Sequence, residues 1–139
     1  MVKTRKDFQM LASMRARDAQ ALANSGNQNG AYYLGGLVIE CALKACIAKK
    51  TRRHDFPAEP KYAGSVYTHD LTQLIRLAGL ESDLERDIKA NQQFAANWGV
   101  VKTWNINCRY DTGPLNGTDL ITAVKSSRDG VLKWIKHYW

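Results

Sequence analysis

The sequence has few cysteines and lacks any long uninterrupted apolar run. Its three cysteines, Cys41, Cys46 and Cys108, are an odd set without Cys-x-x-Cys spacing, which indicates neither a full disulfide framework nor a zinc site. No apolar run reaches the roughly 20 residues that a membrane span requires, and the N-terminus lacks the apolar core and small-residue cleavage site of a signal peptide. We therefore expect reduced, mostly buried thiols in a cytoplasmic protein without a membrane role.

The sequence also lacks the standard signatures of enzymes. No Gly-rich phosphate loop follows a strand, no serine lies in a nucleophile elbow, and the three histidines lack the paired spacing of a metal-binding helix. No low-complexity tract or internal repeat stands out. We therefore expect no metal site and no cofactor.

Length and composition indicate one folded domain that spans residues 1–139. Hydrophobic residues make up 45% of the chain and charged residues 24%, as in folded soluble proteins, and 139 residues suit a single core. Twenty Lys and Arg against thirteen Asp and Glu give a net charge of +7. This excess favours an anionic partner, such as nucleic acid, a nucleotide or an acidic protein, but does not choose among them.

Apolar residues at helical spacing predict an all-α fold, an up-down helical bundle of about five helices. The expected helices cover about 4–24, 32–50, 71–78, 82–95 and a last segment from 118 or 119 to 138. Ser82 and Glu85 match the capping box that begins a helix. The short polar link at 25–30 implies that the first two helices are antiparallel neighbours. We expect loops at 51–68 and 98–117, where Gly and Pro argue against helix.

Residues 32–50 form an unusually apolar helical segment that nevertheless carries Glu40 and Lys44. Placed at i and i+4, their side chains meet on one helix face. A helix that is apolar nearly all round lies inside a bundle, where a charge is costly unless it is paired or hydrogen-bonded. The two residues would therefore face a polar pocket, contact the loop that holds Arg109, or form a structural pair at a buried seam.

Two further groups of residues are candidates for a ligand site. His69 and Asp70 precede the expected helix at 71–78, where Asp70 would either join a site or only stabilise the helix end, with His69 packing nearby. Arg109 lies beside Tyr110 and Asp111, a setting that suits a guanidinium stacked on a ring, paired with a carboxylate or bound to a phosphate. The candidate ligand-binding residues are therefore Arg109, Tyr110, Glu40, Lys44, His69 and Asp70.

A basic run at the end of the central helix is a candidate nucleic-acid contact. Phosphate contacts need flexible positive charge more than strict geometry, although no aromatic residues for base stacking interleave with this run. A solvated surface would explain the same residues. The candidates are Lys49, Lys50, Arg52, Arg53 and His54.

Three large aromatic residues crowd the C-terminus, namely Trp134, Tyr138 and Trp139. Exposed on a small domain, such rings would meet a second subunit rather than water. Packing within the same chain is the alternative.

Three short motifs occur in a familiar order along the chain. The first is Tyr-Tyr-Leu-Gly-Gly at 32–36 leading to Glu-Cys-Ala-Leu-Lys-Ala at 40–45; the second is His-Asp-Leu at 69–71; the third is Trp104 followed by Arg109 and Tyr110. Together they resemble the HEPN domain family. The resemblance implies a helical bundle that commonly forms a homodimer, often encoded beside a small nucleotidyltransferase and often linked to toxin–antitoxin or RNA-related functions.

Many HEPN members are metal-independent ribonucleases whose Arg-x(4-6)-His motif meets its copy across the dimer. This motif is missing here, because from Arg109 the His would fall at Pro114, Leu115 or Asn116, and no histidine of the chain has an Arg at the required upstream distance. Without a His to move the proton of a ribose hydroxyl, the usual acid–base route to RNA cleavage lacks its main participant.

We therefore predict a HEPN-like domain that binds a nucleotide, RNA or a partner protein, as part of a toxin–antitoxin or nucleotidyltransferase-associated system. Its expected partners are a second copy of the chain, a nucleotidyltransferase, and RNA or a nucleotide. Two alternatives stay open. One is a ribonuclease toxin with a displaced active site that uses Arg109 with His69 or His54. The other is a purely protein-binding module whose basic face meets an acidic partner.

Overall fold

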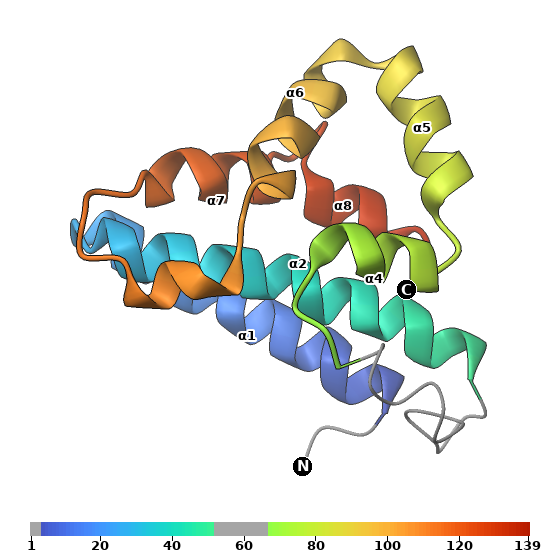
Figure 1. Cartoon of the computed structure of the whole chain (residues 1–139), viewed down its shortest axis with the longest axis horizontal. Helices are drawn as coiled ribbons and strands as arrows, with labels where there is room; N and C mark the ends of the chain where they lie inside the picture. Colours follow the sequence, from blue (N-terminus) through green and yellow to red (C-terminus); the bar gives the residue numbers. More distant parts are fainter. Residues whose placement is uncertain (1–3, 52–66) are drawn as a thin grey trace.

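The computed structural model describes residues 4–51 and 67–139, and every regular element in these ranges is helical (Figure 1). The elements are α1 (Arg5–Asn24), α2 (Gln28–Lys50), α4 (Leu71–Leu77), α5 (Glu81–Ala90), α6 (Gln92–Lys102), the 3-10 helix η1 (Ile106–Tyr110), α7 (Gly117–Lys125) and α8 (Val131–Lys136). The predicted all-α bundle is confirmed for this part of the chain. The predicted number of about five helices is too small, because two expected helices are each divided in two.

Helices α1 and α2 form a long antiparallel hairpin, as the short polar link predicts (Figure 1). A capping box begins α1: the Asp7 amide donates to Thr4 Oγ1 at 3.1 Å, and the Thr4 amide donates to Asp7 Oδ2 at 3.0 Å. Gly26, at φ 83°, provides the left-handed residue of the link. The second helix resumes at Gln28, earlier than the predicted residue 32.

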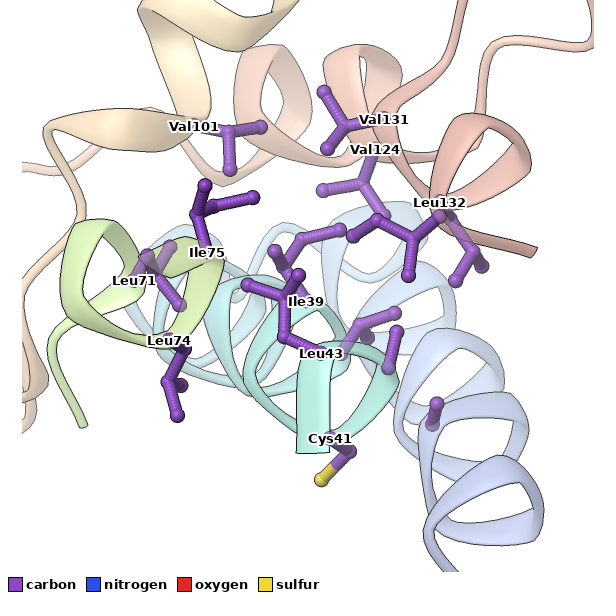
Figure 2. Close-up of a cluster of buried hydrophobic side chains, with 14 of the residues drawn as sticks. Ile39, Cys41, Leu43, Leu71, Leu74, Ile75, Val101, Val124, Val131 and Leu132 are labelled. Carbon is purple, nitrogen blue, oxygen red and sulfur yellow. The ribbon is translucent and has the colours of Figure 1, made fainter. Parts of the chain in front are cut away.

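Helix α2 is the centre of the fold, as its apolar sequence predicts. Its side chains Ile39, Leu43 and Ile47 are almost fully buried. Helix α1 packs along one side, and α4, α7, α8 and η1 cover the others. Figure 2 shows Ile39 and Leu43 in one cluster with Ile75 of α4 and Val124 of α7. Burial from several directions explains why the apolar residues of α2 are not confined to one stripe.

By length and composition alone, α2 is also a candidate membrane span, and it is the one such helix among the described residues. However, 78% of its most apolar 18-residue window is buried inside the bundle. The surrounding helices therefore already cover the surface that a lipid bilayer would cover.

The helix predicted at 82–95 is in fact two helices. The prediction of a capping box at Ser82 is wrong, because α5 begins at Glu81 and its N-cap residue, Leu80, makes no side-chain cap. Asn91 then adopts an extended conformation, with φ −142° and ψ 105°, and its side chain accepts a hydrogen bond from the Phe94 amide at 3.0 Å. Asn91 therefore ends α5 and caps α6, since a short amide side chain competes well with the helical backbone.

The last predicted helix is likewise divided. It begins at Gly117 rather than at residue 118 or 119, because Asn116 Oδ1 accepts from the Asp119 amide at 2.9 Å and so acts as the cap. Gly130 then takes an extended conformation between α7 and α8. A Cβ atom at Gly130 would lie 2.4 Å from the Ser126 carbonyl oxygen, so this tight turn requires glycine.

The segment predicted as a packed loop, 98–117, is partly helical. Helix α6 continues to Lys102, and the short η1 follows. Between them, the buried indole of Trp104 lies directly on α2 at Gly36, where a Cβ atom would come within 1.9 Å of the ring. The absence of a side chain at Gly36 thus allows the close approach that anchors η1, and with it Arg109, on the central helix.

Candidate functional site

Glu40 and Lys44 form an ion pair inside the bundle, as their spacing predicts. The Lys44 Nζ lies 3.3 Å from Glu40 Oε2, and the two residues are only 6% and 5% exposed. Both project from the middle of α2, where apolar neighbours surround them. Neither charge has bulk water to solvate it, so each depends on the other for compensation.

His69 completes a cluster with this pair. Its Nδ1 lies 2.8 Å from Glu40 Oε1, so both carboxylate oxygens of Glu40 are engaged. A carboxylate only accepts hydrogen bonds, so Nδ1 carries a proton and donates it to Glu40. In the neutral tautomer with this proton, Nε2 is the acceptor. The His69 side chain is 46% exposed. A buried carboxylate thus orients an accessible imidazole, which is the arrangement that general acid–base groups require.

Asp70, the next residue, does not join the cluster. Its Oδ1 accepts from the Gln73 amide at 3.1 Å and caps the N-terminus of α4. Helix capping, one of the two interpretations of this residue, is therefore the role that the structure shows.

Arg109 and Tyr110 make no hydrogen bond or ion pair with this cluster in the described ranges. The Arg109 Cζ lies 4.8 Å from the centre of the Tyr110 ring, and Tyr110 is 73% exposed. This pair is the stacked guanidinium that the sequence suggested. The hydrogen bonds of Glu40 and Lys44 within the described ranges involve each other and His69, and none reaches Arg109. Helix α2 packs against η1, which holds Arg109, but no hydrogen bond or ion pair joins the buried pair to Arg109 in the described ranges.

Lys49 and Lys50 lie on the exposed last turn of α2. Lys49 lines an open hollow of about 530 Å³ together with Arg5 and Lys6 from the start of α1. It also lines a second hollow, of about 380 Å³, together with Lys50 and His137. Cations from α1 and α2 thus gather at one end of the bundle.

A C-terminal aromatic residue belongs to the same end. The Arg5 guanidinium donates to the Trp139 carbonyl oxygen at 2.5 Å, and the Lys136 Nζ lies 5.5 Å from the centre of the Trp139 ring. We call the group Arg5, Lys6, Lys49, Lys50 and Lys136 the basic end. The remaining members of the predicted basic run, namely Arg52, Arg53 and His54, lie outside the described residues.

The sequence interpretation missed Arg5 and Lys6 as members of this surface. They are separated from Lys49 by more than forty positions, so no local motif connects them. The signal was present, however, in the predicted antiparallel hairpin. When two helices of similar length pack antiparallel, the start of the first lies beside the end of the second, as Figure 1 shows for α1 and α2.

The cysteines do not form a reactive site. All three are free and buried, as expected. Burial is the largest influence on Cys41 and Cys46 and raises the pKa of each thiol to about 12. At neutral pH both are protonated and poor nucleophiles. No group of three or more His, Cys, Asp or Glu side chains suited to a metal ion occurs in the described ranges.

The aromatic residues of α8 and the following turn pack within the chain. The buried Trp134 ring lies 5.3 Å from Phe94 and 5.1 Å from Tyr138, measured between ring centres. Its indole nitrogen donates to Asp87 Oδ2 at 2.8 Å. Intramolecular packing, the alternative to contact with a second subunit, therefore accounts for Trp134.

No protein-family model matches the chain, and neither a curated protein nor a solved structure matches it.

Proposed function

We propose that this chain is a HEPN-like domain that binds RNA through the phosphate backbone, with the basic end as the contact surface. The observation that carries the proposal is the gathering of Arg5, Lys6 and Lys49 around one open hollow. Arg5 and Lys6 lie at the start of the α1–α2 hairpin and Lys49 lies at its end, so the three side chains come together only in the folded chain. A net charge of +7 adds long-range attraction for a polyanion.

The chemistry of the basic end suits a single strand of RNA. Lysine and arginine contact phosphates without strict geometry, and an aromatic ring beside them can stack with an unpaired base. Trp139 is half-buried and lies next to Lys136 and Arg5, so it supplies such a ring. A folded duplex would offer no free base to this residue.

The resemblance to the HEPN family, which rests on the order of the three motifs, extends this proposal. We propose that the chain forms a cytoplasmic homodimer, has a nucleotidyltransferase partner and belongs to a toxin–antitoxin system. The absence of the Arg-x(4-6)-His motif supports binding rather than cleavage as the primary activity.

Fluorescence anisotropy with a labelled single-stranded RNA of twenty uridines tests the proposal. We expect the double variant Lys6→Gln/Lys49→Gln to bind about tenfold more weakly at low salt and to reduce the slope of log affinity against log salt by about 1.4, or about 0.7 for each lost phosphate contact. Arg5 is left unchanged because its hydrogen bond to Trp139 holds the C-terminus.

The matched control is Lys102→Gln/Lys125→Gln, which removes the same charge from exposed positions on α6 and α7. It should retain most of the affinity. Equal losses in the two double variants would show that net charge, not the basic end, governs binding. Absence of RNA binding at low salt, together with co-purification of an acidic protein, would favour the purely protein-binding alternative.

The Glu40–His69 contact favours a second candidate function, RNA cleavage at a displaced site. With Nδ1 held by Glu40 at 2.8 Å, His69 Nε2 can accept the proton of a ribose 2′-hydroxyl. The 2′ oxygen then attacks the adjacent phosphorus, the bond from phosphorus to the 5′ oxygen breaks, and the proton that His69 has taken up passes to that oxygen. Arg109, exposed on η1, is the cation proposed to stabilise the phosphate charge in this alternative.

Incubation of total RNA with the wild-type chain, His69→Gln and Arg109→Ala tests this second function. Cleavage that is reduced at least about a hundredfold in His69→Gln would support it, since general acid–base groups contribute at least that much. Cleavage that persists in His69→Gln would exclude His69 as the acid–base group. RNA binding without any cleavage would exclude the second function and leave RNA binding as the proposed activity.

A further inference from the structure

A separate cleft lies between the α5–α6 bend and the α7–α8 turn. It has a volume of about 380 Å³, and its lining includes Phe94 and Trp134 together with Arg128, Lys133 and Asp129. Aromatic surface and charged groups of both signs thus meet in one place. None of these residues belongs to the Glu40 cluster or to the basic end.

The walls of this cleft are fixed by hydrogen bonds between the two halves. Asn91 Nδ2 donates to Asp129 Oδ1 at 2.8 Å, and the buried Asn97 donates from Nδ2 to the Asp129 carbonyl oxygen at 2.9 Å. Both bonds join the α5–α6 side to the turn before α8. The cleft is therefore formed before any ligand arrives, which lowers the cost of binding.

The aromatic wall is also held in place. Trp134 donates its indole N–H to Asp87 Oδ2 at 2.8 Å, and the Phe94 ring packs against it at a tilt of 39°. Phe94 and Trp134 are only 4% and 8% exposed, and neither ring can turn without losing these contacts, so the narrow apolar edge that they present to the cleft has a fixed shape. Such an edge suits contact with another ring.

The charges around the cleft do not cancel equally. Asp87 is satisfied by Arg86 and Trp134, whose hydrogen bonds lower the pKa of its carboxyl group. Asp129 and Lys133 each bond to a neutral group: Asp129 accepts from the amide of Asn91, and the Lys133 ammonium donates at 2.7 Å to the carbonyl oxygen of Ser127. Both groups therefore keep their charge.

The exposed Arg128 adds a second cation to this rim. It makes no hydrogen bond or ion pair with the residues that the structure describes. With Asp87 paired to Arg86, the two cations Lys133 and Arg128 face one carboxylate that no described cation pairs, Asp129, which leaves an excess of one positive charge around the cleft. This excess favours an anionic ligand.

We propose that this cleft binds a small aromatic anion, with its ring against Phe94 and Trp134 and its anionic group between Arg128 and Lys133. A volume of about 380 Å³ lies near the small end of ligand sites, which favours a single ring system over a larger molecule. The anionic group is a carboxylate or a phosphate, because a guanidinium binds both in the same bidentate manner. This site is independent of the RNA surface proposed above.

Isothermal titration calorimetry with two probes distinguishes the two anions. Indole-3-acetate represents an aromatic carboxylate, and phenyl phosphate represents an aromatic phosphate. We expect at least one of them to bind the wild-type chain and to lose about tenfold in affinity with Arg128→Gln, which equals about 1.4 kcal/mol. Arg17→Gln, at an exposed arginine on α1, is the matched control and should bind as the wild type does.

Two further measurements test whether the aromatic ring of the ligand contributes to binding and whether it lies against Phe94. Inorganic phosphate should bind more weakly than phenyl phosphate, and Phe94→Leu should weaken the aromatic probe. Failure of both probes to bind, or equal affinity for Arg128→Gln and the wild type, would overturn the proposal.

The double variant Lys6→Gln/Lys49→Gln separates this proposal from the RNA surface. It should bind the aromatic probe normally even though its RNA affinity falls. Loss of the probe in that double variant, with Arg128→Gln unaffected, would assign the site to the basic end and overturn the cleft.

Discussion

The middle and the C-terminal end of α2 both carry charge, but under opposite conditions. In the middle, Glu40 and Lys44 are buried among apolar side chains and satisfy each other. At the end, Lys49 and Lys50 extend from the last turn into open hollows. The two regions are less than two turns of the same helix apart.

The difference shows how surroundings decide what a charge can do. A buried charge must be compensated inside the protein, so the fold itself depends on Glu40 and Lys44 staying together. An exposed lysine is solvated by water and contributes little to stability. Lys49 and Lys50 are therefore available to a partner, whereas Lys44 is committed to the structure.

Removal of one buried partner should produce the largest effect. In Glu40→Ala, Lys44 loses its counter-charge and His69 loses its acceptor, so we expect the free energy of unfolding to fall by about 3–5 kcal/mol. Urea denaturation followed by circular dichroism measures this loss. The double variant Glu40→Leu/Lys44→Met removes both charges and should be more stable than Glu40→Ala. If Glu40→Ala cost less than about 1 kcal/mol, the pair would be behaving as an exposed one.

Gly36, on the same stretch of α2, should give the next largest effect. A methyl group there would overlap the Trp104 ring, so Gly36→Ala should destabilise the chain by about 1–3 kcal/mol, through displacement of η1. Gly99→Ala is the control, because no atom lies within 4 Å of its added Cβ in helix α6. It should be neutral or stabilising by up to about 1 kcal/mol. Equal losses at both positions would contradict the packing of Trp104 on α2.

The thiols of Cys41 and Cys46 report where the protected part of α2 ends. Because burial raises the pKa of each to about 12, little thiolate is present at pH 8. We expect iodoacetamide to label both at least about tenfold more slowly in the native protein than in urea. Mass spectrometry of peptides resolves the two sites. Fast native labelling of Cys46 alone would place the boundary before Cys46 rather than after it.

The end of α2 should give the smallest change in stability. Lys49→Gln/Lys50→Gln removes two exposed charges, so the free energy of unfolding should stay within about 0.5 kcal/mol of the wild type. Thermal denaturation checks this value. A loss as large as that of Glu40→Ala would show that these lysines stabilise the fold and are not free for a partner.

Helices were predictable where one local signal dominates the sequence. The apolar residues of α2 and the glycine after α4, Gly79, identified a central helix and a helix end. Breaks within α-helical patterns were not predictable in the same way. At Asn91 and Gly130 the periodicity of apolar residues continues across the break, and the decision depends on caps and close contacts that form only in the folded chain.

The same distinction applies to the candidate site. The i and i+4 spacing was enough to bring Glu40 and Lys44 together, because the geometry of a single helix sets their distance. The contact of Glu40 with His69 joins residues 29 positions apart, and no local rule specifies it. Whether Asp70 belonged to the site or capped α4 also required the backbone position of Gln73.

By itself, the sequence determined the all-α class, the central position of α2 and its buried ion pair, because helical periodicity and the cost of burying charge act over a few residues. The tertiary structure alone decided that Arg5 and Lys6 meet Lys49 and that Arg128 shares a cleft with Phe94. Such groupings depend on how helices pack, and packing energy is a sum over many contacts between distant residues that no single segment encodes.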